Sequence, residues 1–144
     1  MATQNDLVWP YEHWPAIRFN DGMNIGSRGG HGFVRYTIID FREGEYIKFQ
    51  FSKPDGFNGI HELKITALNS NTTEIRHEIN AKLSFKAVLL WVYAVRWLHD
   101  ALIEDAFDKV ENHFLAEKKE TTYNVWVKLL RKIYKSKSFQ TKLA

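Results

Sequence analysis

The change of pattern between residues 73 and 116 decides the fold. The stretch TEIRHEINAKL at Thr73–Leu83 alternates apolar or histidine side chains with charged or amide ones. From residue 85 the string FKAVLLWVYAVRWLHDALIEDAFDKVENHFLA spaces its apolar residues three and four apart instead. A period of two is typical of a strand with one wet face, and a period near 3.6 is typical of an amphipathic helix. The sequence therefore predicts a strand followed directly by a long helix over residues 85–116.

Three further strand patterns precede this stretch, at residues 33–41 (FVRYTIIDF), 46–52 (YIKFQFS) and 60–68 (IHELKITAL). Short turns between consecutive strands predict an antiparallel meander with one face in water. The first 32 residues predict an irregular lead-in, with one short helix or edge strand at about residues 11–19 and a tight turn in the glycine-rich segment around His31. The alternation assigns twelve side chains to the inner face: Ile47, Phe49, Phe51, His61, Leu63, Ile65, Ala67, Ile75, His77, Ile79, Ala81 and Leu83.

The long helix changes character along its length. Near its start, Leu90, Tyr93 and Trp97 lie on the face that becomes acidic later, so this part is apolar on two sides and predicts cover from two directions. The acidic run predicts a solvated face with two ion pairs at i,i+4 spacing. Its residues are Asp100, Glu104, Asp105 and Asp108, and the predicted pairs are Arg96–Asp100 and Asp105–Lys109.

The last segment predicts an additional helix. Residues 123–135 (YNVWVKLLRKIYK) gather basic side chains on one arc and large apolar ones on the other. We therefore divide the chain into a domain at residues 1–120 and a basic amphipathic tail at residues 121–144. Three roles suit such a tail: cover for the two-sided helix, a contact between two copies of the chain, or a helix lying on a membrane surface.

Composition excludes several classes of function. There is no cysteine, which excludes disulfides, thiolate zinc sites and cysteine nucleophiles. Residues 121–144 carry six Lys or Arg and no acid, so the first 120 residues sum to −3 within a net charge of +3. A mildly acidic body does not favour nucleic-acid binding. The polar start and the absence of a long apolar run predict a soluble, cytoplasmic protein without a signal peptide.

Three histidines are the candidates for chemistry. His61 and His77 occupy inner positions of adjacent predicted strands, and His99 lies on the apolar stripe of the helix. They can orient a ligand carbonyl or act as acid and base, since imidazole titrates near neutral pH. Alternatively, each is a buried, neutral, hydrogen-bonded core residue. Three histidines match the ligand count of a zinc site but lack its motif spacing, so we expect neither a metal nor another cofactor.

Five strings, in this order and spacing, carry a family resemblance: WPAIRF at residues 14–19, GGHGFVRY at 29–36, GFNGIH at 56–61, IRH at 75–77 and HDAL at 99–102. Over about residues 7–114 the chain resembles a bacterial branch of the SRPBCC superfamily, which shares the START and Bet v 1-like fold and includes polyketide cyclase-like proteins. The resemblance implies a helix-grip fold, in which a curved antiparallel sheet wraps around the C-terminal helix and leaves a hydrophobic cavity. The N-terminal strand and helices of that fold are shortened here.

Under this resemblance we expect a binding protein that carries or senses a small apolar molecule, such as a lipid, polyketide or aromatic compound. A cyclase, dehydratase or hydrolase with His61 or His77 as general base is the alternative, and an interaction module acting through residues 123–135, on a membrane or a second copy, is a third. An enzyme is the less favoured interpretation, because no catalytic motif is present. The expected ligand-binding residues are His61, His77, His99, Phe49, Phe51, Leu63, Ile65, Ile79, Val95, Leu102 and Ile103.

Overall fold

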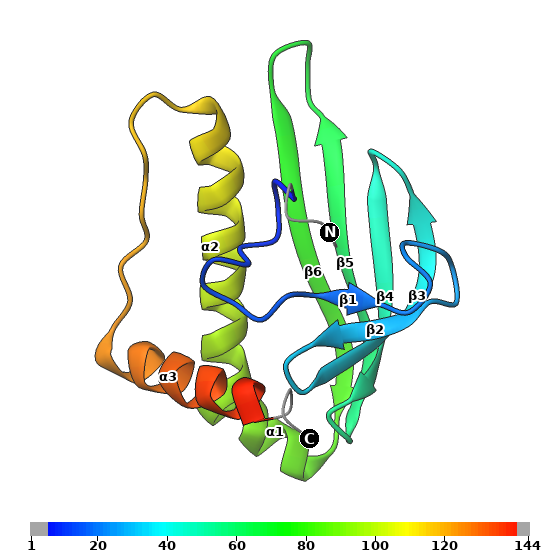
Figure 1. Ribbon diagram of the computed structural model, residues 1–144. Helices are drawn as coiled ribbons and strands as arrows, with labels where there is room; N and C mark the ends of the chain where they lie inside the picture. Colours follow the sequence, from blue (N-terminus) through cyan, green and yellow to red (C-terminus); the bar gives the residue numbers. More distant parts are fainter. Residues whose placement is uncertain (1–5, 141–144) are drawn as a thin grey trace. The chain divides into compact units, whose positions relative to one another are not determined.

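A computed structural model describes residues 6–140, with side chains described for residues 6–135. Within this range, six strands are followed by the helical elements α1, η1, α2 and α3. The strands form one antiparallel sheet in the order β1-β2-β3-β4-β5-β6, so each strand pairs with its neighbours in the sequence (Figure 1). The predicted α+β class, with a meander, a long helix and a further C-terminal helix, is confirmed.

The chain forms two compact units. One is Arg18–Ala87, which contains the sheet. The other joins the lead-in up to Ile17 to the chain from Val88 onward. The part of the lead-in up to Ile17 therefore packs with helices that follow it by some seventy residues or more. Among the helices that the structure describes, none combines the length and apolarity needed to cross a bilayer.

Four strands lie where the alternating pattern predicted them: β3 at Val34–Arg42, β4 at Tyr46–Lys53, β5 at Phe57–Ala67 and β6 at Thr73–Leu83. β5 begins earlier than the predicted start at residue 60 and pairs with β6 along its whole length. The two faces differ as predicted. Along β6, His77 and Ile79 are half-buried, whereas Glu78 and Asn80 are exposed.

The lead-in contributes two strands. β1 at Arg18–Phe19 is an edge strand and lies at the end of the segment for which a short helix or an edge strand was predicted, whereas β2 at Arg28–His31 was not predicted. The segment predicted as a tight turn is therefore largely strand β2, and the turn itself comes after it, at Gly32, where φ is 52°. Gly29 pairs with Phe19, and a Cβ at Gly29 would collide with the β1 backbone. Glycine in a strand marks such a close approach of two backbones, so its presence did not signal a turn here.

The predicted long helix is present but is not α-helical throughout. α1 spans Phe85–Leu90, the π-helix η1 spans Trp91–Val95, and α2 spans Arg96–Phe114. In η1 the Arg96 N–H bonds to the Trp91 carbonyl oxygen, which adds one residue to the turn. The sequence predicted that a second element covers the outer apolar side chains near the start of this helix. Those side chains are not covered, because Leu90, Tyr93 and Trp97 are 40%, 64% and 40% exposed.

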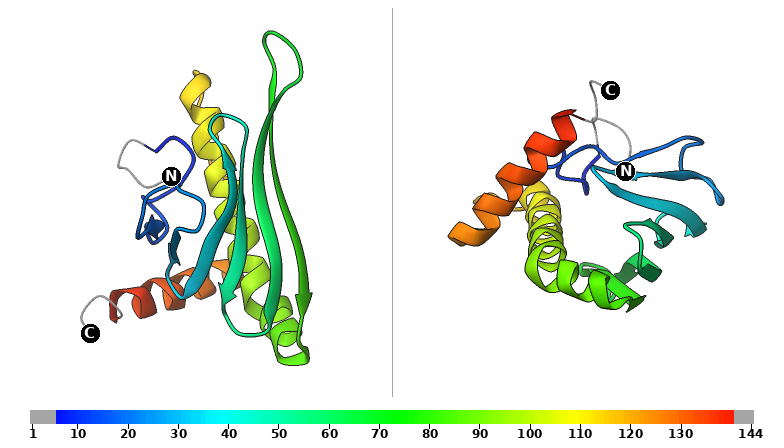
Figure 2. Two further views of the ribbon diagram at one scale, coloured as in Figure 1. Left: turned by 90° about the vertical axis from the view of Figure 1, so that its right-hand side faces the viewer. Right: turned by 90° about the horizontal axis from the view of Figure 1, so that it is seen from below.

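The predicted tail helix is α3, Val125–Gln140. It crosses the long helix (Figure 2) and packs mainly on α2, with one hydrogen bond from the Trp126 indole to the Tyr93 carbonyl oxygen of η1. The packing forms a core with the lead-in, made of Trp14, Ala101, Leu102, Val127 and Tyr134, with Trp9, Leu98 and Tyr123 around it. Of the three predicted roles for the tail, intramolecular packing is therefore observed. The tail helix covers α2 at Ala101 and Leu102, which follow the segment that is apolar on two sides.

Asp105 holds this core together, so the prediction of a solvated acidic face was wrong at this position, and it was also wrong at Asp108, which is buried. The Asp105 carboxylate is 11% exposed and forms an ion pair with Arg131 at 3.0 Å. It also accepts hydrogen bonds from the Trp14 indole at 2.7 Å and the Tyr123 hydroxyl at 2.6 Å. Burial and the hydrogen bond to Asp105 raise the pKa of Tyr123 well above its ordinary value.

The predicted ion pairs of the acidic run have mixed outcomes. Arg96 and Asp100 do pair, at 3.7 Å. Lys109 does not pair with Asp105, because its ammonium binds Glu12 at 3.0 Å and the Trp9 carbonyl oxygen at 2.9 Å. These contacts attach the lead-in to α2. Sequence spacing did not reveal them because the partners are about one hundred residues apart.

Candidate functional site

An aromatic cluster surrounds His61 on one face of the sheet. Strand register places it there: Phe49 lies opposite His61 across β4 and β5, and Tyr36 lies opposite Phe51 across β3 and β4. Directly paired residues of an antiparallel sheet point to the same face. We call Tyr36, Phe49, Phe51, His61 and His77 the His61 cluster.

The His61 ring is in contact with three aromatic rings. Its centroid lies 4.6 Å from Phe49 and 5.1 Å from Phe51, both close to parallel, and 4.5 Å from Tyr36 in a tilted arrangement. Such contacts hold the imidazole in one orientation and shield its faces from water. The ring is therefore a fixed polar group within an apolar surface.

His61 and His77 also contact each other. His61 Nδ1 lies 3.3 Å from His77 Nε2, so one of these nitrogens donates a hydrogen bond to the other. The register explains the contact: His77 pairs with Leu63, the next residue on the same face of β5 after His61. The contact agrees with the predicted positions of both histidines on the inner face of adjacent strands.

A second histidine contact extends the polar groups toward β2. His31 Nε2 lies 2.9 Å from the Tyr36 hydroxyl, and both residues are buried. Sequence analysis assigned His31 to a turn and gave Tyr36 no role. The available signal was the alternation of β3, which puts Tyr36 on the same face as the apolar Ile38.

Burial decreases across this face from β4 to β6. Phe49 is 2% exposed and Leu63 8%, so both are core residues. The other expected ligand-binding residues of the sheet, Phe51, His61, Ile65, His77 and Ile79, are half-buried. The half-buried members keep part of their side-chain surface exposed.

The remaining expected site residues belong to the other unit. His99 Nδ1 lies 3.2 Å from Asp100 Oδ1, and this hydrogen bond is the main cause of the lowered pKa of Asp100. Val95 and Ile103 are half-buried, and Leu102 is buried in the core with Trp14. From their positions on the inner face and on the apolar stripe of the helix we expect His61, His77 and His99 to converge, and this stays a prediction. Among the residues that the structure describes, no group of three or more metal-ligating side chains is close enough to hold an ion.

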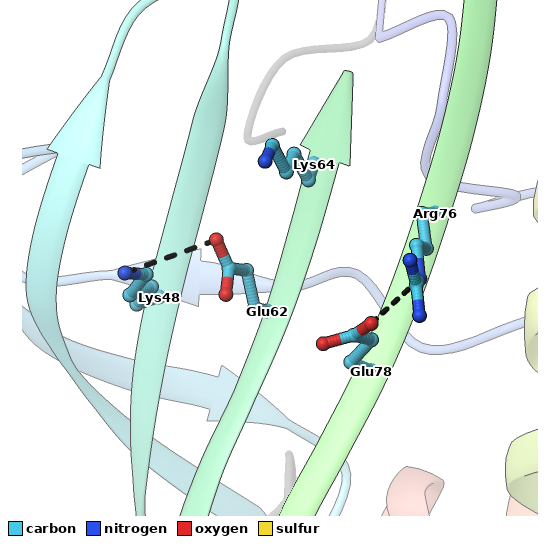
Figure 3. A pocket seen from close by; sticks show the side chains of 5 residues that line it. All are labelled: Lys48, Glu62, Lys64, Arg76 and Glu78. Atoms are coloured by element: carbon cyan, nitrogen blue, oxygen red, sulfur yellow. Dashed lines mark ion pairs between the residues drawn. The ribbon is translucent and has the colours of Figure 1, made fainter. Parts of the chain in front are cut away.

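The opposite face of the sheet carries a shallow polar hollow of about 260 Å³ (Figure 3). Its charged side chains pair across and along the strands, with Lys48 3.9 Å from Glu62 and Arg76 2.6 Å from Glu78. Exposed pairs of this kind contribute about 0–1 kcal/mol each. The hollow is lined by Lys48, Glu62, Lys64, Arg76 and Glu78, a set that does not suit an apolar ligand.

Compared with known proteins, the chain matches no family model, no curated protein and no solved structure at a significant level.

Proposed function

We propose that the protein binds a small, largely apolar molecule on the sheet face that carries the His61 cluster, and that it acts as a carrier or sensor of that molecule. The observation that supports this most strongly is the position of His61, which lies between aromatic rings and in contact with His77. Ligand sites typically combine an apolar lining with a few oriented polar groups. Aromatic rings would bind the apolar body of the ligand, and imidazole nitrogens its carbonyl or hydroxyl group.

The family resemblance adds the helix-grip arrangement to this proposal. In that arrangement the long helix covers the same face of the sheet, and His99, Val95 and Ile103 contribute to the lining. The half-buried side chains of β6 support an apolar partner for this face, since Ile75, Ile79 and Leu83 all point to it.

Native mass spectrometry of freshly purified protein tests the proposal. We expect a co-purifying molecule in the wild type and in His113→Gln, a matched control in which the changed histidine is exposed and lies outside the cluster. His77→Gln removes one polar group from the cluster. It should weaken binding about tenfold, because a hydrogen bond contributes about 1–1.5 kcal/mol.

The proposal fails if no molecule co-purifies and if titration with a medium-chain fatty acid or a naphthol leaves the NMR signals of His61 and His77 unchanged. It also fails if His77→Gln and His113→Gln retain the bound molecule equally.

The contact between His61 and His77 favours a second candidate, an enzyme that acts on the same molecule. Two imidazoles 3.3 Å apart can hydrogen-bond, so that one ring fixes the orientation and tautomer of the other, as an imidazole acting as general base requires. This candidate predicts that the mass of the bound molecule changes during incubation of the wild type. In His77→Gln the molecule would stay bound with an unchanged mass.

A further inference from the structure

The helix α3 has three faces rather than two. Its buried face consists of Val127, Leu130 and Tyr134, which are 4%, 9% and 7% exposed. A basic stripe of Lys128, Lys132 and Lys135 is exposed on one side. On the remaining side lies an apolar row that we call the α3 ridge. It consists of Val125, Trp126, Leu129 and Ile133, which are 83%, 45%, 46% and 44% exposed.

The contacts of α3 with its own chain fix the direction of this ridge. The Arg131 guanidinium pairs with Asp105 and lies 5.0 Å from the centres of both the Trp14 and Tyr123 rings. Because these contacts hold the buried face of α3 against α2, the helix cannot rotate to bury the ridge without breaking them. The exposure of the ridge is therefore built into the packing.

The ridge continues onto the π-helix. The Trp126 indole donates a hydrogen bond of 3.2 Å to the Tyr93 carbonyl oxygen, and the Trp97 indole donates one of 3.0 Å to Val92. Both indoles are thus oriented by backbone groups of η1. In the same helical stretch, Leu89 of α1 and Val92 and Tyr93 of η1 are 44%, 47% and 64% exposed. An apolar surface of this extent on a folded protein marks an interaction site.

The positive charge around this apolar surface indicates what kind of partner it binds. Residues 83–99 and 121–144, which include this surface, contain no aspartate or glutamate but several lysines and arginines. Exposed tryptophan and tyrosine next to lysines suit the interface of a bilayer, where rings enter the headgroup region and ammonium groups meet phosphates. A second copy would bring two basic surfaces together, which is unfavourable.

We propose that the α3 ridge, the basic stripe and the exposed part of η1 together form a docking surface for an anionic lipid membrane. The protein would lie on the bilayer with α3 in the interface plane, its lysines on headgroups and the ridge among the upper acyl carbons. This surface belongs to the helical unit alone, so the proposal stands independently of any ligand on the sheet.

Co-sedimentation with sucrose-loaded vesicles tests it, using phosphatidylcholine alone and phosphatidylcholine with 30% phosphatidylglycerol. We expect full-length protein to bind the anionic vesicles and to be released by salt. Lys128→Gln with Lys132→Gln should weaken binding about fivefold per lysine, since each basic residue at an anionic surface contributes about 1 kcal/mol. The matched control, Lys82→Gln with Lys118→Gln, makes the same charge change at exposed sites elsewhere and should bind like the wild type.

The apolar part is tested by Leu129→Gln with Ile133→Gln, which should reduce vesicle binding while leaving the circular dichroism spectrum and melting temperature unchanged, because both side chains point away from the core. Three results would each overturn the proposal: no binding to anionic vesicles, equal binding to neutral ones, or equal loss in the two lysine pairs. A dimer that dissociates when Leu129 and Ile133 are changed would assign the surface to a second copy instead.

Discussion

Replacing Asp105 by alanine removes the group on which the packing of α3 depends. The carboxylate is 11% exposed and receives the Arg131 guanidinium, the Trp14 indole and the Tyr123 hydroxyl within 3.0 Å. These three partners come from α3, the lead-in and the segment between α2 and α3. Alanine would therefore leave the Arg131 cation and the Trp14 N–H without their acceptor in a largely buried place, whereas the Tyr123 hydroxyl would keep the Ala101 carbonyl oxygen at 3.0 Å.

The expected loss is large. Arg131 is 17% exposed, and breaking a buried ion pair by removing one partner typically costs about 3–5 kcal/mol because the other charge stays buried. Asp105→Asn keeps the size and one acceptor oxygen but loses the charge, so we expect roughly half of that cost. We therefore predict that the free energy of unfolding decreases from the wild type to Asp105→Asn and further to Asp105→Ala.

Urea unfolding followed by circular dichroism and by tryptophan fluorescence measures this cost. With an m value of about 2 kcal/mol/M, a loss of about 4 kcal/mol lowers the midpoint by about 2 M urea. Coincident transitions by the two probes would establish that the unfolding is two-state and that the free energies are comparable.

Glu104→Ala is the matched control, because Glu104 is exposed on the preceding position of the same helix. Its effect should stay within about 0.5 kcal/mol. If Asp105→Ala and Glu104→Ala unfold at midpoints within about 0.3 M of each other, Asp105 does not anchor α3 and the account of this core is wrong.

Three further substitutions have definite expected outcomes. Because the pKa of Tyr123 is raised in the folded protein, the unfolded chain loses the Tyr123 hydroxyl proton at a lower pH than the folded chain does. The free energy of unfolding should therefore decline as the pH rises above about 10. Tyr123→Phe should remove that decline, which melting curves at alkaline pH measure. Gly29→Ala places a methyl group against the β1 backbone and should cost about 1–3 kcal/mol, read as a melting temperature lower by several degrees, whereas an unchanged value would contradict the close approach of β1. The Asn112 side chain bonds the backbone N–H and C=O of Lys119 at 2.7 Å each, so Asn112→Ala should speed amide exchange at Lys119 markedly, and unaltered exchange would show that this loop is held elsewhere.

Much of the fold could be predicted because the spacing of apolar residues within each segment indicates its secondary structure. The four long strands and the long helix follow from alternation and from helical spacing within each segment. β2 could not be predicted in this way, since it contains two glycines, and β1, which is only two residues long, was predicted only as one of two alternatives, a short helix or an edge strand. Their pairing depends on a close approach between segments, which no single segment displays.

The candidate site was predictable to a similar degree. His61 and His77 lie together because the alternation of β5 and β6 points both to one face, and their contact needs only the register of neighbouring strands. Tyr36 and His31 were missed because their contact depends on the β2–β3 hairpin, whose first strand was not expected.

The sequence by itself determined which residues share a face, because that property depends on positions two, three or four apart. Tertiary structure alone decided what each face meets. Asp105, on a helix face predicted to be solvated, is buried by Trp14, 91 positions away, and by Arg131, 26 positions away. The same packing directs the α3 ridge outward, although its pattern would have suited a buried helix equally well. Burial depends on contacts between distant segments, and these form only when the whole chain has folded.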